Sequence, residues 1–258
     1  MTKKLDGRIK RTESGRAMLN LGCGYKMHRD WTNLDFSLYA RLAHHKKIGR
    51  LLRKLGILSE ERYQRLLGVD PDIIIWDLRR GIPFSDAAFD AVYHSHLLEH
   101  LDRDSAPLLL TECRRVLRSG GIIRMAVPDL RFLIDRYNSA VSKLERGDEM
   151  ASNEHQQAIT GLFDQMVRRQ LTGPGGQSAF MLAAERLLRG DTAKTGCLHR
   201  WMYDKHSLEA LMKTVGFKDI RQRGVYESGI EGWRRFNLDN RDDGTAYKPE
   251  SIYMEGVK

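Results

Sequence analysis

The feature that most constrains the fold is a series of short apolar segments that alternate with helical patterns. Strand-like segments lie at residues 18–21, 31–35, 73–77, 89–94 and 122–127. Before the last of these, residues 105–117 carry apolar side chains at helical spacing and end at Ser119-Gly-Gly121, a typical helix stop. Strands that alternate with helices predict βαβ units, and hence an α/β fold with a mostly parallel sheet.

Two insertions interrupt this alternation. Residues 40–69 separate the second strand from the third, and their composition predicts basic helices. A helix is predicted at 130–144, and a polar, weakly patterned stretch follows at about 145–200. We expect this second insertion to form a lid, together with the aromatic and basic segment 198–203.

The strand and helix pattern resumes near the end of the chain. It predicts a helix at 205–215 and strands at 217–225 and 251–257. We therefore expect one domain over residues 17–258. Residues 1–16 form a basic tail that could be disordered.

The positive charge is concentrated near the start of the chain. The protein has 43 Lys and Arg against 34 Asp and Glu, a formal net charge of +9. Residues 1–16 hold six basic and two acidic side chains, residues 41–68 hold eight and two, and residues 69–258 hold 27 and 28. This distribution argues against nucleic-acid binding over the whole surface and favours one or two local contacts with anionic groups.

The composition also restricts the cellular compartment that we expect for the protein. The apolar runs fall far short of the roughly 20 residues that a membrane-spanning helix needs. The three cysteines, Cys23, Cys113 and Cys197, are too few and too widely spaced for a disulfide framework or a CxxC zinc pair. No signal-like segment opens the sequence, so we expect a cytoplasmic protein.

Residues 41–58 have the pattern of a basic amphipathic helix. Its apolar positions follow helical spacing, at Ile48, Leu51, Leu52 and Leu55, and five Lys and Arg side chains lie opposite them. Three interpretations stay open. The stripe could pack on the domain, the helix could adsorb to an anionic membrane at its inner face, or it could clamp a phosphate-bearing substrate.

A ligand site is predicted where three strands end. The first strand runs into Gly22-x-Gly24, Asp35 ends the second, and Asp77 ends the third. Glycines at a strand–helix crossing let the backbone approach a ligand closely, and an acid on the neighbouring strand can accept two ribose hydroxyls. The dinucleotide-binding fingerprint needs a third glycine at the position of Met27, so that fingerprint is absent.

These residues resemble the class I S-adenosylmethionine-dependent methyltransferases. The matching stretches are Leu19–Gly24 (LNLGCG), Asn33–Asp35 (NLD), Trp76–Phe84 (WDLRRGIPF), Phe89–Leu101 (FDAVYHSHLLEHL) and Arg115–Ile123 (RVLRSGGII). The resemblance implies a Rossmann-like, doubly wound sheet of seven mostly parallel strands with an antiparallel last strand. It also implies S-adenosylmethionine as cofactor and S-adenosylhomocysteine as product.

The resemblance further implies roles for residues at the matching positions. Gly22, Cys23 and Gly24 would form the turn under the methionine part of the cofactor, and Asp35 would bind the ribose hydroxyls. The adenine would lie at Asp77 and Leu78, and Ser95 and His96 would border the transferred methyl. The family turn often carries a leading acid and a third glycine; here Asn20 stands near the place of the acid.

A hydroxyl acceptor would need a general base near the methyl. The candidates are His96, His94, His100 and Asp129, with Glu99 behind the histidines. Each has a structural alternative: the Glu-His pair could brace the loop, and Asp129 could cap the following helix. No Asn/Asp-Pro-Pro-Tyr/Phe sequence follows the fourth strand, which disfavours methylation of base amino groups.

Several alternatives accompany the predicted methyltransferase. His96-x-x-Glu99-His100 fits the inverted zinc-peptidase pattern, although the sequence locates no third ligand and we expect no metal site. The basic segments could serve an RNA methyltransferase, or the chain could be a non-catalytic cofactor-binding partner. The ending of the chain resembles bacterial methyltransferases encoded among surface-polysaccharide glycosyltransferases, which implies O-methylation of a sugar or lipid-linked glycan.

Overall fold

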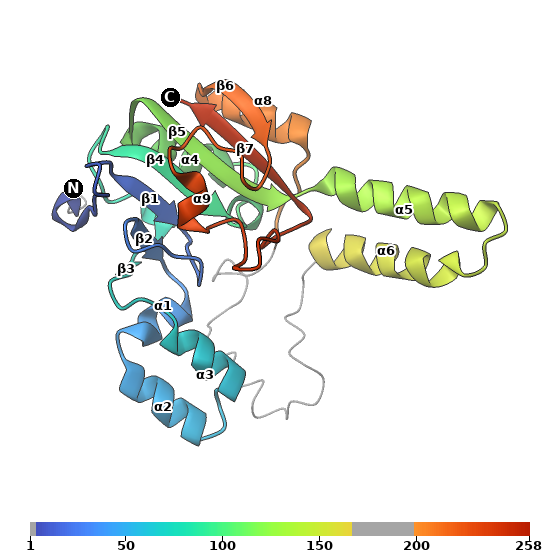
Figure 1. Cartoon of the computed structure of the whole chain (residues 1–258), viewed down its shortest axis with the longest axis horizontal. Helices are drawn as coiled ribbons and strands as arrows, with labels where there is room; N and C mark the ends of the chain where they lie inside the picture. The colour runs from blue at the N-terminus through green and yellow to red at the C-terminus, as the bar shows by residue number, and fades with distance from the viewer. Residues whose placement is uncertain (1–3, 167–198) are drawn as a thin grey trace.

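A mixed sheet organises the protein (Figure 1), in a computed structural model that describes residues 4–166 and 199–258. Within these residues seven strands run in the order β3-β2-β1-β4-β5-β7-β6. Their bounds are β1 Met18–Leu21, β2 Thr32–Asp35, β3 Ile74–Ile75, β4 Phe89–Ser95, β5 Leu117–Pro128, β6 Lys218–Arg223 and β7 Ser251–Val257. β7 pairs antiparallel with β5 and β6, and the other pairs are parallel. The predicted seven-stranded Rossmann-like fold is confirmed.

The two faces of the sheet bury different side chains of the same strands. One face packs Leu19, Val92 and Ile123 against the helices α4 (Ser105–Val116) and α8 (Lys205–Val215). The other face packs Met18 and Tyr93 against residues 230–238, which include the short helix α9 (Trp233–Phe236). Alternation along each strand sends neighbouring residues to opposite faces, so both faces of β1 and β4 are covered.

Residues 4–16 pack on the domain, so the expected disordered tail is not found there. A 3-10 turn, η1 (Asp6–Arg8), lies beside residues 83–85. The backbone N–H of Leu5 donates to the carbonyl of Pro83 at 2.7 Å, and the N–H of Ser85 donates to the Asp6 carboxylate at 2.8 Å. The basic side chains of this segment are thus carried by an ordered strap.

The first insertion contains three helices, of which two take the place of the single basic helix predicted at 41–58. They are α1 (Leu38–Ala43), α2 (Lys46–Lys54) and α3 (Glu60–Leu67), and they lie beyond the β3 edge of the sheet (Figure 1). His45, with extended φ of −129°, separates α1 from α2, so the helical pattern is interrupted there. Ser59 caps α3, since its hydroxyl accepts a hydrogen bond from the N–H of Arg62.

The second insertion begins with a helical hairpin that projects from the sheet (Figure 1). It pairs α5 (Leu130–Glu145), which matches the predicted helix, with α6 (Ala151–Met166), which the weak pattern did not predict. The rest of the expected lid, with Gly173–Gly176, Cys197 and Leu198, lies outside the described residues. No helix among the described residues is long and apolar enough to cross a bilayer.

Candidate functional site

The glycine turn after β1 forms one side of a pocket. Gly22 and Gly24 have φ of 60° and 51°, the left-handed region that glycine adopts without strain. The N–H of Cys23 donates to the carbonyl of Leu34 at 3.1 Å, which holds the turn against β2. A Cβ added to Gly24 would meet no atom within 4 Å, so space beside the turn is open to a ligand.

Asp35 ends β2 beside this turn and is buried. Its carboxylate accepts the N–H of Gly24 at 2.8 Å and the N–H of Ser37 at 2.5 Å. The Asp35 carboxylate therefore holds the glycine turn in place. Each carboxylate oxygen can accept more than one hydrogen bond, so Asp35 keeps capacity for the hydroxyls of a ribose.

The end of β4 forms the opposite side. His96 follows Ser95 with φ of 50°, a left-handed conformation that is uncommon outside glycine and concentrates at functional sites. Its Nδ1 lies 3.1 Å from Oε1 of the fully buried Glu99, and its Nε2 lies 2.9 Å from the hydroxyl of Ser251. Burial works to raise the pKa of Glu99, but the hydrogen bond and charge of His96 outweigh it and leave the pKa lowered.

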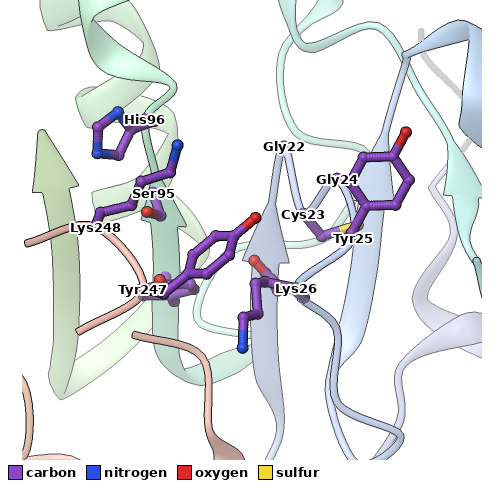
Figure 2. Close-up of a pocket in the computed structure, with 11 residues that line it drawn as sticks. Gly22, Cys23, Gly24, Tyr25, Lys26, Ser95, His96, Tyr247 and Lys248 are labelled. Carbon is purple, nitrogen blue, oxygen red and sulfur yellow. The ribbon is translucent and has the colours of Figure 1, made fainter. Parts of the chain in front are cut away.

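These two sides enclose a cavity of about 160 Å³ at the carboxyl ends of β1 and β4 (Figure 2). Its lining residues are Asn20, Gly22, Cys23, Gly24, Tyr25, Lys26, Tyr93, Ser95, His96, Tyr247 and Lys248. The volume is smaller than the roughly 300–1,000 Å³ of typical ligand pockets. It suits the methionine end of the predicted cofactor rather than the whole molecule.

A family comparison identifies this arrangement. Residues 19–125, which include the glycine turn, Asp35 and the end of β4, match a family model described as a methyltransferase domain. The chain contains a methyltransferase domain. The match covers less than half of the chain, and it indicates a methyltransferase domain in this region. No curated protein matches the sequence.

The solved structures that match the chain have low sequence identity to it. A SAM-dependent methyltransferase from Archaeoglobus fulgidus is 15% identical, with 97% of this chain and 86% of that chain covered and a TM-score of 0.39. A SAM-dependent methyltransferase from Thermotoga maritima is 13% identical, with 93% and 81% covered and a TM-score of 0.40. Haemonchus contortus phosphoethanolamine N-methyltransferase 2, solved with S-adenosylhomocysteine, is 12% identical, with 100% and 49% covered and a TM-score of 0.40.

Several pocket residues of the methyltransferase domain were not predicted. Tyr247 and Lys248 come from the loop before β7, and Figure 2 shows the Tyr247 ring between the glycine turn and the Ser95–His96 side. Lys26 holds this loop region, because its ammonium donates to the carbonyl of Asn240 at 2.7 Å and lies 4.7 Å from the Tyr247 ring centre. Burial lowers the pKa of Lys26.

Asn20 supports the glycine turn. The sequence placed it near the position of the family's acid but did not predict its contacts. Its amide donates to the carbonyl of Lys26 at 2.8 Å and to the side-chain oxygen of Asn33 at 3.0 Å. The carbonyl of Lys26 closes the segment that follows Gly24. Asn20 therefore holds that segment to β1 and β2, without the negative charge of the acid that the family often has there.

The predicted adenine residues do not line the described pocket. Asp77 lies two residues after β3 and caps the 3-10 turn η2 (Leu78–Arg80), where its carboxylate accepts the side-chain N–H groups of Arg79 at 2.6–3.1 Å. The hydrogen bonds from Arg79 lower the pKa of Asp77. Leu78 packs partly against the main core. Both lie at the strand end that the sequence indicated, and their contact with adenine stays a prediction.

His94 is corrected as a candidate base. Tyr93 and Ser95 line the pocket, so alternation along β4 turns the side chain of His94 to the other face of the sheet. The ring is fully buried, and neither nitrogen has a hydrogen-bond partner among the described residues. Burial lowers its pKa to about 4. A ring in this position does not reach the pocket.

Asp129 and His100 also lie away from the pocket lining. Asp129 takes the alternative role considered for it, since its carboxylate caps α5 by accepting the N–H of Arg131 at 2.9 Å. Burial raises the pKa of Asp129. The ring of His100 lies 4.9 Å from that of His199, behind the loop that carries His96. The structure thus brings only His96 of the four candidate bases into the pocket.

The inverted zinc-peptidase arrangement is not formed. Its pattern requires His96 and His100 one turn apart on an α-helix, but only Leu98–His100 are helical, in the 3-10 turn η3. His96 precedes that turn in a left-handed conformation and faces Ser251. Glu99 lies instead with His100 and His199, and one ligand-type atom of each comes within 4.8 Å of the others.

The segment expected to join the lid divides between core and surface. Tyr203 is buried in the main core, and burial raises its pKa to about 12. Trp201 is 39% exposed, and the guanidinium of Arg103 lies 4.7 Å from its ring. Arg200 and Trp201 donate their backbone N–H groups to the carbonyl of Glu99, which ties this segment to the loop after β4.

Proposed function

We propose that the methyltransferase domain transfers the methyl of S-adenosylmethionine to a hydroxyl of a sugar or lipid-linked glycan. The observation that carries this proposal is His96, the candidate base that lines the pocket and contacts a buried carboxylate. A hydroxyl nucleophile needs a proton acceptor near the reacting atoms. A stronger nucleophile reacts once it is aligned with the methyl carbon and the sulfur. His96 supplies that acceptor.

The cofactor would bind across the ends of β1, β2 and β4. Gly22, Cys23, Gly24 and Ser95 would contact the methionine part, because all four line the pocket. Asp35 would accept the ribose hydroxyls beside the N–H of Gly24. Asp77 and Leu78, which follow β3, would border the adenine. When bound, the cofactor supplies an electrophilic methyl group on a sulfonium.

The contacts of His96 set the direction of proton transfer. With Nδ1–H directed to Glu99, Nε2 carries the lone pair and accepts a proton. Ser251 occupies the position from which a hydroxyl reaches Nε2, at 2.9 Å. An acceptor hydroxyl that displaces the Ser251 hydroxyl from Nε2 would give its proton to Nε2 as its oxygen forms the bond to the methyl carbon, while the carbon–sulfur bond breaks. Glu99 would stabilise the resulting imidazolium.

The acceptor side of the pocket supports a sugar. The ring of Tyr247 offers an apolar face with a hydroxyl at its edge, which is the combination that packs against sugar rings. Lys248 adds a donor beside it, suited to a polar or anionic substituent. These groups agree with the surface-polysaccharide role that the sequence implied.

The test is methyl transfer with matched variants. Purified protein, labelled S-adenosylmethionine and a bacterial extract rich in glycan precursors should yield S-adenosylhomocysteine and a methylated, mass-identified glycan. His96→Ala should bind cofactor normally and lose about 10²–10⁴-fold in turnover, the usual contribution of a general base. His206→Ala, an exposed histidine on α8, is the matched control and should keep full activity.

Cofactor binding is tested separately through Asp35. Asp35→Asn should weaken S-adenosylmethionine binding by calorimetry, by about 1–3 kcal/mol for the lost charged hydrogen bonds. Unchanged affinity would contradict the assigned ribose site. Full turnover in His96→Ala would remove that residue as base, and a methylated nitrogen in the product would contradict the hydroxyl acceptor.

With a lipid-linked acceptor, methyl transfer would take place at the cytoplasmic face of a membrane. We propose that the protein meets such a surface peripherally through residues 41–58. The basic excess of residues 41–68, with eight basic and two acidic side chains, supports this location.

A further inference from the structure

The outer face of α2 carries an apolar stripe that is exposed in the described structure. Ile48, Leu51 and Leu55 expose 47%, 55% and 63% of their surface. At 100° per residue these three lie within about 60° of one another around the helix. The opposite side is the packed one: a Cβ on Gly49 would come 2.3 Å from a methyl of Leu66 on α3. The stripe therefore faces away from α3.

Cations surround this stripe. α2 has no acidic residue, and its five basic side chains are Lys46, Lys47, Arg50, Arg53 and Lys54. Lys47 and Lys54 lie within about 60° of Leu51 around the helix, beside the apolar side chains. Arg53 bonds Glu60 of α3 at 2.8 Å, so one charge is used within the insertion. The other four are exposed, and of these Lys47 and Lys54 lie next to the stripe.

A broad hollow of about 610 Å³ adjoins the start of α2. His44, His45, Lys46 and Lys47 line it together with Ile48, so donors and cations stand directly beside an apolar side chain. This combination matches the chemistry of a phospholipid, in which glycerol links a phosphate to two acyl chains. It is the arrangement of an interfacial helix, with an apolar strip next to a basic border.

We propose that α2 lies flat in the surface of an anionic phospholipid membrane. Ile48, Leu51 and Leu55 enter the boundary between headgroups and acyl chains, and Lys47 and Lys54 contact the phosphates. The inference deepens the proposed function, because it names the surface from which a lipid-linked acceptor would be reached. The binding itself requires neither cofactor nor acceptor.

A membrane fits this face better than a second copy of the chain. The area that three half-exposed side chains can bury is well below the roughly 800 Å² that each partner buries in a stable protein interface. Two copies meeting on this face would also bring two acid-free basic helices together, and their like charges would repel. An anionic lipid surface neutralises the same charges and needs no large complementary area.

The experiment is co-sedimentation of the full chain with vesicles, without cofactor. Phosphatidylcholine vesicles containing about one-third phosphatidylglycerol should bind at least tenfold more protein than phosphatidylcholine alone, and added salt should reduce this preference. I48S/L51S/L55S should lower binding to anionic vesicles at least tenfold. K47Q/K54Q should remove most of the preference for anionic lipid while leaving the apolar stripe intact.

Leu108→Ser is the matched control, because Leu108 is 68% exposed on α4 and lies outside the proposed surface. It should bind vesicles as the wild type does, and circular dichroism checks that each variant is folded. Equal binding to both vesicle types, or wild-type binding by both α2 variants, would overturn the proposal. So would a vesicle-independent dimer that I48S/L51S/L55S dissociates, since that outcome assigns the stripe to a second copy. An inactive enzyme that still binds anionic vesicles would contradict only the proposed reaction.

Discussion

Arg124 is the most informative residue to perturb, because it is a fully buried cation on β5. Its Nε donates to Asp239 at 2.8 Å, and its Nη1 donates to Glu255 at 2.9 Å and to the carbonyl of Glu227 at 2.8 Å. The guanidinium also lies 4.5 Å from the Trp233 ring. One side chain thus joins β5 and β7 to the chain segment between β6 and β7.

The expected cost of Arg124→Met follows from what the substitution leaves behind. Glu255 keeps the N–H of Gly229 at 2.9 Å and the side chain of Arg223 at 3.2 Å, so it stays partly compensated. Asp239 keeps only the hydroxyl of Tyr93, at 2.5 Å, among the side-chain donors of the described residues. Removing one partner of a buried ion pair costs about 3–5 kcal/mol, chiefly through the charge left without its partner.

Denaturant unfolding of matched variants measures this cost. Arg118→Met is the control, because Arg118 lies on the same strand and pairs with Asp90, but 56% of the Arg118 side chain is exposed. That pair should contribute less than about 1 kcal/mol. R124M/D239N should recover about 2 kcal/mol relative to R124M, because it removes the unpaired carboxylate. Equal losses for Arg124→Met and Arg118→Met would refute the reasoning.

Two further predictions concern the strand ends. The pKa of His94 is about 4 in the fold against an ordinary 6.5, so its contribution to stability is present above pH 6.5 and lost as pH falls toward 4. With chelator present, the wild type should lose about 3 kcal/mol more than His94→Leu between pH 7 and 4; parallel pH profiles would contradict this. Gly22→Ala forces a left-handed alanine whose Cβ lies 3.1 Å from Leu97, and should weaken S-adenosylmethionine about tenfold by calorimetry. Gly7→Ala, with open space at its Cβ, should not.

The fold was predictable because its strands are short, buried and separated by clear stops. All four residues of β1 are buried, which is why an apolar run followed by glycine located it. α8 is bounded by Asp204, whose side chain caps the N–H of Ser207, and by Gly216 in a left-handed conformation. Both ends are local signals of the sequence. They need no knowledge of the tertiary structure.

The elements that sequence reasoning missed lack such signals. α6 buries little more than Ala151 and Ala158 while Phe163 stays 65% exposed, so no continuous apolar stripe marks the helix. α2 has a strong stripe, but the pattern could not show that Gly49 forms the packed side and leaves the stripe outside. Periodicity identifies an amphipathic face, and only packing decides whether another element covers it.

The residues of the candidate site also fall into a predicted group and a group that the sequence did not predict. Gly22, Gly24 and Asp35 lie within fourteen residues of sequence. The N–H of Gly24 donates to the Asp35 carboxylate and the N–H of Cys23 donates to the carbonyl of Leu34, so their proximity follows from local spacing. Tyr247 reaches the pocket from more than two hundred residues away. Local motifs therefore indicated the predicted cofactor side, while the proposed acceptor side depended on a tertiary arrangement that no local pattern records.

The buried Arg124 network links this acceptor side to the stability of the sheet. Asp239, which Arg124 holds, accepts the N–H of Tyr247 at its backbone carbonyl, at 2.7 Å. The next residue, Asn240, accepts the ammonium of Lys26 at 2.7 Å. The Asp35 carboxylate shares none of these contacts, and the glycine turn meets them through Lys26, whose N–H donates to the carbonyl of Cys23 at 2.9 Å. Loosening the network should therefore disturb acceptor binding while S-adenosylmethionine binding persists, so Arg124→Met should raise the KM for the acceptor more than that for the cofactor, and equal increases would show that the two sides of the pocket are not held independently.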